Sequence, residues 1–248
     1  MPYRSIRIGN NLHPYIWQGR GNNCNVCLFT DILRGKRRHI IIDPGHLVNE
    51  LGEGCFDDLV KSMERDGIKV EDIGLIINTH AHPDHCEANQ AIVQKSRGKG
   101  GNSQTLIALS REEDEYRRRM GERLYSLLGV KPPEFEPFFY LGEGNLTLGK
   151  ENRLNLQILN TPGHSPGSIS LYLPEGKILI AGDVIFCGSV GRTDFPGGSL
   201  ATLRKSIERL SELDIECLIC GHSTELGSII MGRERLKHNF QAIRPLIY

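Results

Sequence analysis

Short apolar runs alternate with amphipathic stretches along most of the chain. The apolar runs have the length of strands and are bounded by glycine, proline, asparagine or aspartate. They cover residues 15–17, 25–30, 39–42, 74–78, 105–109, 154–159, 168–173, 177–180 and 215–219. Amphipathic stretches with helical spacing follow several runs, as in Phe56, Leu59 and Met63 or after the potential N-cap Ser199. This alternation predicts a protein of the α/β (α+β) class that is built from two halves, each with a sheet and helices.

The middle of the chain is predicted to carry a helical insertion at about residues 96–140. Ser110 and Glu113 form a capping-box pattern, so we expect a helix from Ser110 to about Leu128. One face of this helix would present four apolar residues: Tyr116, Met120, Leu124 and Leu127. A stretch rich in glycine, lysine and serine precedes the helix, and several prolines follow it. An insertion of this kind can cover a site as a lid.

The bulk composition is that of a soluble globular protein. The chain has 248 residues, and we expect one domain over 1–248. Hydrophobic residues make up 39% and charged residues 24%, while Lys plus Arg and Asp plus Glu are equal at 30 each. This neutrality gives no reason to expect a nucleic-acid partner. The N-terminus lacks an apolar signal core, and no apolar run approaches the roughly 20 residues of a membrane span, so we expect a cytoplasmic protein without membrane contact.

The seven cysteines are an odd, scattered set, which argues against a disulfide framework. Two pairs have the CxxC spacing, Cys24/Cys27 and Cys217/Cys220. Both lie in predicted strands, where residues three apart point to opposite faces and chelate poorly, so we expect buried reduced thiols. Cys86 could act as a nucleophile or a weak ligand, but a packed thiol is the favoured interpretation.

The segment 79–85 reads THAHPDH and follows an apolar run. His80 and His82 are two residues apart and would lean to the same side of an extended chain. Pro83 favours a turn, after which an aspartate and a histidine stand at the start of a helix expected to run to about Lys95. Burying so many titratable groups without a metal or strong partners would be costly. Imidazoles and a carboxylate that converge on one point suit a transition metal.

Further strand ends carry the same residue types. The candidate metal ligands are five histidines and two aspartates: His80, His82, Asp84, His85, His164, Asp183 and His222. One catalytic zinc or iron needs three or four protein ligands, so seven suit two metals that share a ligand. Asp183 can bridge because a carboxylate has two oxygens. The sequence therefore predicts two divalent transition metals (zinc, iron or manganese) and a hydroxide that attacks an electrophilic carbonyl.

The order of these ligands resembles the metallo-β-lactamase superfamily. The match is the pattern HxHxDH at 80–85 followed by His164, Asp183 and His222. The resemblance implies an αβ/βα four-layer sandwich with the metals at one edge between two β-sheets. It further implies a division of ligands: His80, His82 and His164 on the first metal, Asp84, His85 and His222 on the second, and Asp183 bridging. Asp84 and Asp183 are accordingly the expected catalytic carboxylates.

Two further segments, TPGHSPGSISLY and GDVIFCGSVGRTDFPGGS, resemble the glyoxalase II-like branch, which includes thioesterases and persulfide dioxygenases. Arg192 and Asp194 lie in the GRTD element of this branch, where a loop-bracing ion pair is favoured over Arg192 as a ligand for an anionic thiol substrate. Only 26 residues follow His222, too few for the helical glutathione-binding domain of full-length glyoxalase II. Cys86-Glu87 also stands where the branch usually has a small residue and glycine.

The leading hypothesis is a dinuclear metal hydrolase of the hydroxyacylglutathione hydrolase type, acting on a small-molecule thioester or related ester. Three alternatives stay open. One is a mononuclear persulfide dioxygenase with a single iron held by His80, His164 and Asp183. The others are a lactonase, if the insertion reshapes the pocket, and a non-catalytic metal-binding protein. No oligomeric state follows from the sequence.

Overall fold

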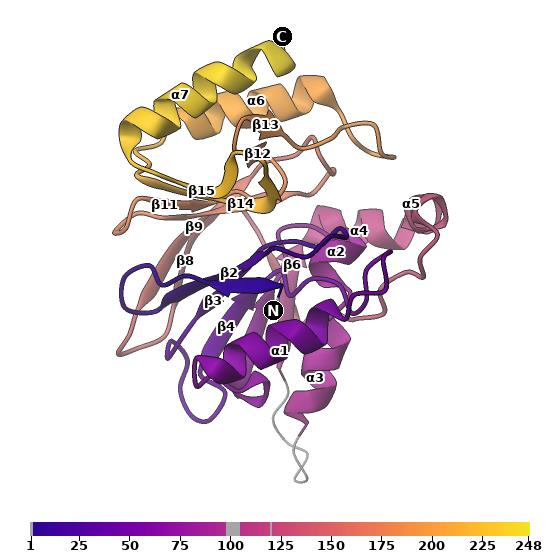
Figure 1. Ribbon diagram of the computed structural model, residues 1–248, viewed down its shortest axis with the longest axis vertical. Helices are drawn as coiled ribbons and strands as arrows, with labels where there is room; N and C mark the ends of the chain where they lie inside the picture. Colours follow the sequence, from indigo (N-terminus) through magenta and orange to yellow (C-terminus); the bar gives the residue numbers. More distant parts are fainter. Residues whose placement is uncertain (1, 98–104, 120) are drawn as a thin grey trace. The chain divides into compact units, whose positions relative to one another are not determined.

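The structure is a computed structural model that describes residues 2–97, 105–119 and 121–248 (Figure 1). The chain divides into two compact units. The first contains Met1–Leu109, Pro133–Tyr140 and Leu148–Leu154, and the second contains Ser110–Pro132, Leu141–Thr147 and Asn155–Tyr248. Each unit has one large β-sheet and helices of its own, so the predicted α/β class is confirmed.

The first unit is built on a seven-stranded sheet whose strands follow chain order. The strands are β1 (Tyr3–Ser5), β2 (Leu12–Trp17), β3 (Val26–Phe29), β4 (His39–Ile42), β5 (Ile73–Ile77), β6 (Leu106–Ser110) and β7 (Phe139–Leu141). Strands β1 to β4 are antiparallel, whereas β4, β5 and β6 are parallel, with Ile42 beside Ile77. The parallel pairing brings the carboxyl ends of β4 and β5 to one edge of the sheet.

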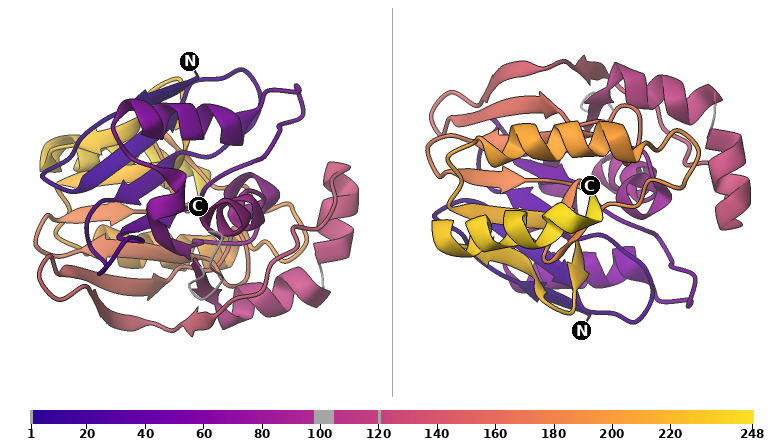
Figure 2. Two further views of the ribbon diagram at one scale, coloured as in Figure 1. Left: turned by 90° about the horizontal axis from the view of Figure 1, so that it is seen from below. Right: turned by 90° about the horizontal axis from the view of Figure 1, so that it is seen from above.

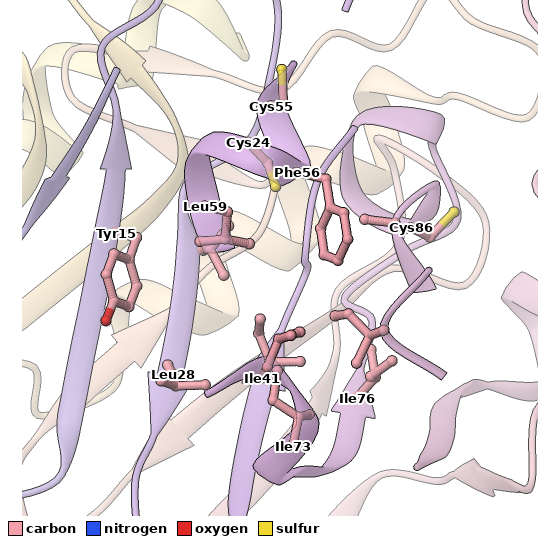
Figure 3. Packing of buried hydrophobic residues seen from close by; sticks show 14 of the residues in the cluster. Tyr15, Cys24, Leu28, Ile41, Cys55, Phe56, Leu59, Ile73, Ile76 and Cys86 are labelled. Atoms are coloured by element: carbon pink, nitrogen blue, oxygen red, sulfur yellow. The ribbon is translucent and has the colours of Figure 1, made fainter. Parts of the chain in front are cut away.

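The helices of this unit are α1 (Cys55–Arg65), the 3₁₀ turn η1 (Val70–Asp72), α2 (Pro83–Cys86) and α3 (Asn89–Ser96). Helices α1 and α3 lie over the sheet, and Phe56 and Leu59 of α1 pack in a buried cluster with Ile41 and Ile76 (Figures 1 and 3). The prediction of one helix to about Lys95 is wrong. The backbone N–H of Ala88 donates to the carbonyl of Gly45 (2.9 Å), outside the helix, so α2 ends and α3 starts anew.

The second unit has a six-stranded sheet in the order β15-β14-β11-β10-β9-β8. These strands are β8 (Gly144–Leu148), β9 (Leu154–Asn160), β10 (Ile169–Leu173), β11 (Ile178–Ile180), β14 (Cys217–Thr224) and β15 (Gly227–Met231), and a small hairpin adds β12 (Ile185–Phe186) and β13 (Ser189–Val190). Helices α6 (Leu200–Ser211) and α7 (Arg233–Ile243), with the 3₁₀ turn η2 (Arg244–Leu246), cover one face (Figures 1 and 2). Ser199 caps α6 through the Thr202 amide, as predicted.

Over the predicted insertion helix the structure describes α4 (Arg111–Arg119) and α5 (Gly121–Leu128), on either side of residue 120. Tyr116 and Leu124 are buried together with Tyr125, but Leu127 is 70% exposed. The prediction that Leu127 belongs to the buried face is therefore wrong. Met120 and positions 98–104 of the predicted glycine- and lysine-rich loop lie outside the described residues.

All seven cysteines are buried and none forms a disulfide, as the scattered spacing predicts. Cys86 packs in the core of the first unit, where its thiol donates to the carbonyl of His82 (3.3 Å). In the second unit the Cys187 and Cys220 sulfurs lie 3.9 Å apart. Within the described part of the chain, none of the helices combines the length and apolar character needed to cross a bilayer.

Candidate metal centre

In the first unit, the carboxyl ends of two parallel strands place Asp43 beside Thr79. Ile42 pairs with Ile77, so the residues that follow each strand meet at the sheet edge. The Asp43 carboxylate accepts from the Thr79 amide (2.8 Å) and the Thr79 hydroxyl (2.6 Å). Asp43 is buried and has a φ of 51°, in the left-handed region that aspartate tolerates better than most residues.

The four motif residues His80, His82, Asp84 and His85 lie together at this edge, and all are buried. The rings of His80 and His82 meet edge to face with centroids 4.6 Å apart, and the rings of His80 and His85 are 4.0 Å apart. Potential ligand atoms of His80 and His82, and of Asp84 and His85, lie within 4.8 Å of each other. The structure therefore brings the four side chains of the motif together.

Asp43 orients two of the imidazoles from behind. Its Oδ2 accepts from His85 Nδ1 (3.0 Å), and the Thr79 hydroxyl, which donates to Asp43, accepts from His80 Nδ1 (3.0 Å). Because a carboxylate only accepts, this chain puts the protons of both rings on Nδ1. The Nε2 atoms then carry the lone pairs that metals bind, and carboxylate–imidazole pairs of this kind usually tune metal sites.

The two carboxylates of the segment after Pro83 have separate partners: Asp84 is held by Asn22, and Glu87 contacts the loop after Gly45. The Asn22 side-chain amide donates to Asp84 Oδ2 (2.8 Å), and the Asn22 backbone N–H donates to Glu50 (2.8 Å). Glu87 contacts His46 Nδ1 (2.8 Å) and accepts from the amide of Leu47 (3.0 Å). The Glu87 carboxylate thus anchors the loop after Gly45, while the buried Cys86 thiol fills the core.

In the second unit, a parallel pair again brings two candidate ligands together. Ile180 of β11 is in register with Ile219 of β14, and Asp183 and His222 each follow by three residues. Asp183 Oδ2 lies 3.3 Å from His222 Nε2. The prediction that the strand ends before His222 is wrong, because β14 continues to Thr224. Its register against β15 shifts between Ile219 and Thr224, an irregularity that re-aims side chains.

His164 lies in the turn between β9 and β10. Its Nε2 lies 3.4 Å from Asp183 Oδ2, the same oxygen that faces His222. Its Nδ1 donates to the carbonyl of Arg192 (2.7 Å), because a carbonyl only accepts. As in the first unit, the hydrogen bond at Nδ1 leaves Nε2 as the nitrogen with the lone pair.

Two positions beside Asp183 have room only for glycine. A Cβ at Gly191 would lie 1.8 Å from the Asp183 carbonyl oxygen, and a Cβ at Gly221 would lie 2.2 Å from Asp183 Oδ1. Real Cβ atoms do not approach that closely, so backbone on both sides fixes the position of the Asp183 carboxylate.

Arg192 and Asp194 form a bidentate ion pair, with nitrogen–oxygen distances of 2.7 and 2.6 Å. Both side chains are more than half exposed, and the guanidinium stacks 3.8 Å from the centroid of the Phe195 ring. The hydrogen bonds from Arg192 lower the pKa of Asp194 to about 2. This geometry fits the loop-bracing interpretation of Arg192.

The sequence model of the metallo-β-lactamase superfamily matches residues 20–222 of the chain. The chain belongs to this superfamily. Its members bind divalent metals and are mostly hydrolases. Over 198 residues the chain is 37% identical to a probable metallo-hydrolase of Methanocaldococcus jannaschii, covering 77% of this chain and 85% of the relative.

Two other comparisons support the glyoxalase II-like branch and the metallo-β-lactamase fold. A hydroxyacylglutathione hydrolase of Haemophilus influenzae is 30% identical over 88% of this chain and 92% of its own length. The crystal structure of a B3 metallo-β-lactamase superposes with a TM-score of 0.66 at 25% identity, over 96% of this chain and 97% of that one. The expected superfamily and fold are therefore confirmed.

Sequence reasoning missed the residues that orient the ligands. Asp43 follows a buried strand just as the predicted ligands do, so the same strand-end criterion would have found it. Asn22 and the Arg192 carbonyl carry no such signal, because one acts from an irregular loop and the other through its backbone.

Proposed function

We propose that the chain is a dinuclear metal hydrolase that cleaves a thioester or a related ester. The observation that carries the proposal is Asp183, whose Oδ2 faces the Nε2 atoms of His164 and His222 at 3.4 and 3.3 Å. The proton of His164 is on Nδ1, so its Nε2 lone pair faces this carboxylate oxygen, which is unfavourable without a cation and favourable with one. Superfamily membership supplies the second line of support.

The donor set fits divalent transition metals. Imidazole nitrogens and carboxylate oxygens suit zinc, iron and manganese alike. The hydrogen bonds at Nδ1 of His80, His85 and His164 leave Nε2 of each ring as the nitrogen with the lone pair that a metal binds. A crystal structure with 26% identity and a TM-score of 0.62, described as a di-iron-bound form, provides a related example.

We assign the metal ligands from the candidate residues of both units. The first metal would be held by His80, His82 and His164, the second by Asp84, His85 and His222, with Asp183 shared. Bound cations would lower the pKa of a coordinated water and polarise an acyl carbonyl. Asn22 would keep Asp84 turned toward its metal, and Asp43 would keep His85 and, through Thr79, His80 in the required tautomers.

The thioester preference rests on the relatives and on leaving-group chemistry. Besides the hydroxyacylglutathione hydrolase, an acyl-coenzyme A thioesterase of Gallus gallus is 30% identical over 84% of this chain and 75% of its own length. When hydroxide adds to a thioester carbonyl, the carbon–sulfur bond breaks and a thiolate leaves. A thiolate is a stable anion near neutral pH, so the leaving group needs no strong general acid.

The decisive experiment measures metal content and substrate turnover on protein purified without added metal. We expect two equivalents of metal per chain, hydrolysis of acyl thioesters, and loss of activity on chelation with recovery on metal addition. A panel of thioesters, lactones and phosphoesters is assayed together with oxygen uptake on glutathione persulfide. One iron per chain together with oxygen uptake would identify the protein as a persulfide dioxygenase instead. Turnover of lactones alone would identify a lactonase. Metal-loaded protein that is inactive on the whole panel would indicate a non-catalytic metal-binding protein.

The Arg192→Ala variant tests whether Arg192 braces its loop or holds the substrate. Exposed ion pairs contribute about 0–1 kcal/mol, so we expect kcat/KM to fall less than about fivefold. The fall should be the same for thioesters with anionic and neutral thiol groups. A tenfold or larger rise in KM that is restricted to the anionic substrate would instead identify Arg192 as a substrate ligand.

A further inference from the structure

The first turn of α4 holds the loop that carries His164. Glu113 is fully buried, and its Oε2 accepts from the Ser165 hydroxyl and from the Gly167 amide, each at 2.8 Å. The Ser110 hydroxyl donates to the Gly167 carbonyl (2.5 Å). A Cβ on Gly167 would lie 2.2 Å from the Glu113 nitrogen, so loop and helix are in direct backbone contact. Three hydrogen bonds therefore fix the residues immediately after His164.

The polarity of this contact is also determined. A carboxylate only accepts, so the Ser165 hydroxyl spends its single proton on Glu113. The Ser168 hydroxyl, 2.6 Å from that of Ser165, must then donate to it, and the Ser165 amide donates to the Ser168 hydroxyl (3.3 Å). The Ser165 amide and the two serine hydroxyls thus form one chain of hydrogen bonds that ends on the Glu113 carboxylate, which the Gly167 amide reaches directly.

The same helix contacts the second segment that holds the His164 ring. The Tyr116 hydroxyl donates to the Pro196 carbonyl (2.5 Å), and the Tyr116 ring packs so close to Gly197 that a Cβ there would lie 2.8 Å away. This loop also contains Arg192, whose carbonyl accepts from His164 Nδ1. Helix α4 therefore fixes both the backbone after His164 and the loop that orients its imidazole.

We propose that Glu113 is a positioning residue that sets the geometry of His164 for metal binding. The proposal rests on the proposed function only for the role of His164 as a ligand. A capping role alone does not explain the carboxylate: the Ser110 hydroxyl accepts from the Glu113 amide (3.1 Å), as a capping box requires, yet the Glu113 side chain contacts the His164 loop. Burying a charge for this contact is costly, which points to a need for a precisely held loop.

The test is zinc affinity, measured on metal-free protein by competition with a chromogenic chelator. In Glu113→Gln the amide oxygen can still accept, but the charge that aligns the donors is lost. Mutation of a residue that positions a metal ligand typically weakens metal affinity by 10–100-fold. We therefore expect the dissociation constant of at least one bound zinc to rise about tenfold. Ser165→Ala removes one donor and should act in the same direction. The effects of the two changes should combine to less than their sum, because both remove the Ser165–Glu113 hydrogen bond.

Asp114→Asn is the matched control. Asp114 is the adjacent buried carboxylate, but it binds Arg117 (2.7 Å) and Arg118 (2.9 Å) of its own helix. We expect Asp114→Asn to lower the stability of the metal-free protein without changing zinc affinity. If Glu113→Gln and Ser165→Ala behave like this control, with destabilised folding and wild-type zinc affinity, Glu113 is merely structural. If Glu113→Gln does not fold, Ser165→Ala decides.

The two proposals fail differently. Wild-type protein that binds zinc but hydrolyses no ester or thioester would overturn the proposed function while the effect of Glu113→Gln on affinity still stands. Active wild-type protein with unchanged zinc affinity in both variants would overturn the role of Glu113 alone. Wild-type protein that binds no divalent metal would overturn both.

Discussion

Asp183→Asn will lower kcat/KM by at least about a thousandfold while the protein stays folded. Losing one preorganised hydrogen-bond donor to the transition state typically costs about 10²–10³ in rate, and Asp183 is in addition the proposed shared metal ligand, so we expect a loss at or above the upper end. Asparagine matches aspartate in shape, so the crowding by Gly191 and Gly221 is tolerated. Steady-state kinetics, circular dichroism and metal content on the same preparation measure the three effects.

The control for this variant is Asp194→Asn, which removes an exposed carboxylate from a neighbouring loop. We expect it to retain activity within about fivefold. Near-wild-type kcat/KM in fully metallated Asp183→Asn protein would refute a bridging role for Asp183 and with it the dinuclear mechanism.

Asp43→Ala will produce the second large effect, on stability and metal affinity together. The substitution strands the Thr79 amide, the Thr79 hydroxyl and His85 Nδ1 in a buried site, and it forces alanine into a φ of 51°. Unsatisfied buried donors and left-handed strain together predict a loss of about 3–5 kcal/mol in the free energy of unfolding. Urea denaturation of metal-free protein isolates this loss from the contribution of bound metal.

Asp43→Asn separates the two roles of this residue. Asparagine tolerates the left-handed backbone and retains one acceptor oxygen, so the loss of stability should be smaller than for alanine. Zinc affinity should still fall about tenfold or more, because the oxygen that fixes the His85 tautomer loses its charge. An Asp43→Ala protein within about 1 kcal/mol of wild type would show that Thr79 and His85 find other partners.

The ligand types could be predicted from sequence because each follows a short apolar run. What the sequence does not contain is register. Asp183 meets His222 because Ile180 of β11 is paired with Ile219 of β14, 39 residues later in the chain. Helix α6 lies between these two strands in the sequence. Periodicity describes each strand by itself and gives no information on which residues align.

The errors in the predicted elements share a cause of the same kind. The helix after Pro83 stops because the Ala88 amide bonds to Gly45, and β14 passes beyond Cys220 because β15 continues to pair with it. Glu113 shows the limit most clearly. Its spacing from Ser110 indicates a capping box, and the amide half of that box is present, but the carboxylate is drawn to Ser165 by tertiary structure. Partners distant in sequence decide between local alternatives of similar energy.

The crowding of Asp183 by Gly191 and Gly221 sets a rule for engineering this protein toward new substrates. A library that randomises whole loops would include these two positions and would lose most of its members to collisions with the Asp183 backbone and carboxylate. A productive library keeps both glycines and varies exposed side chains such as Leu226. The diversity would then fall on exposed side chains, while the backbone around Asp183 is inherited unchanged.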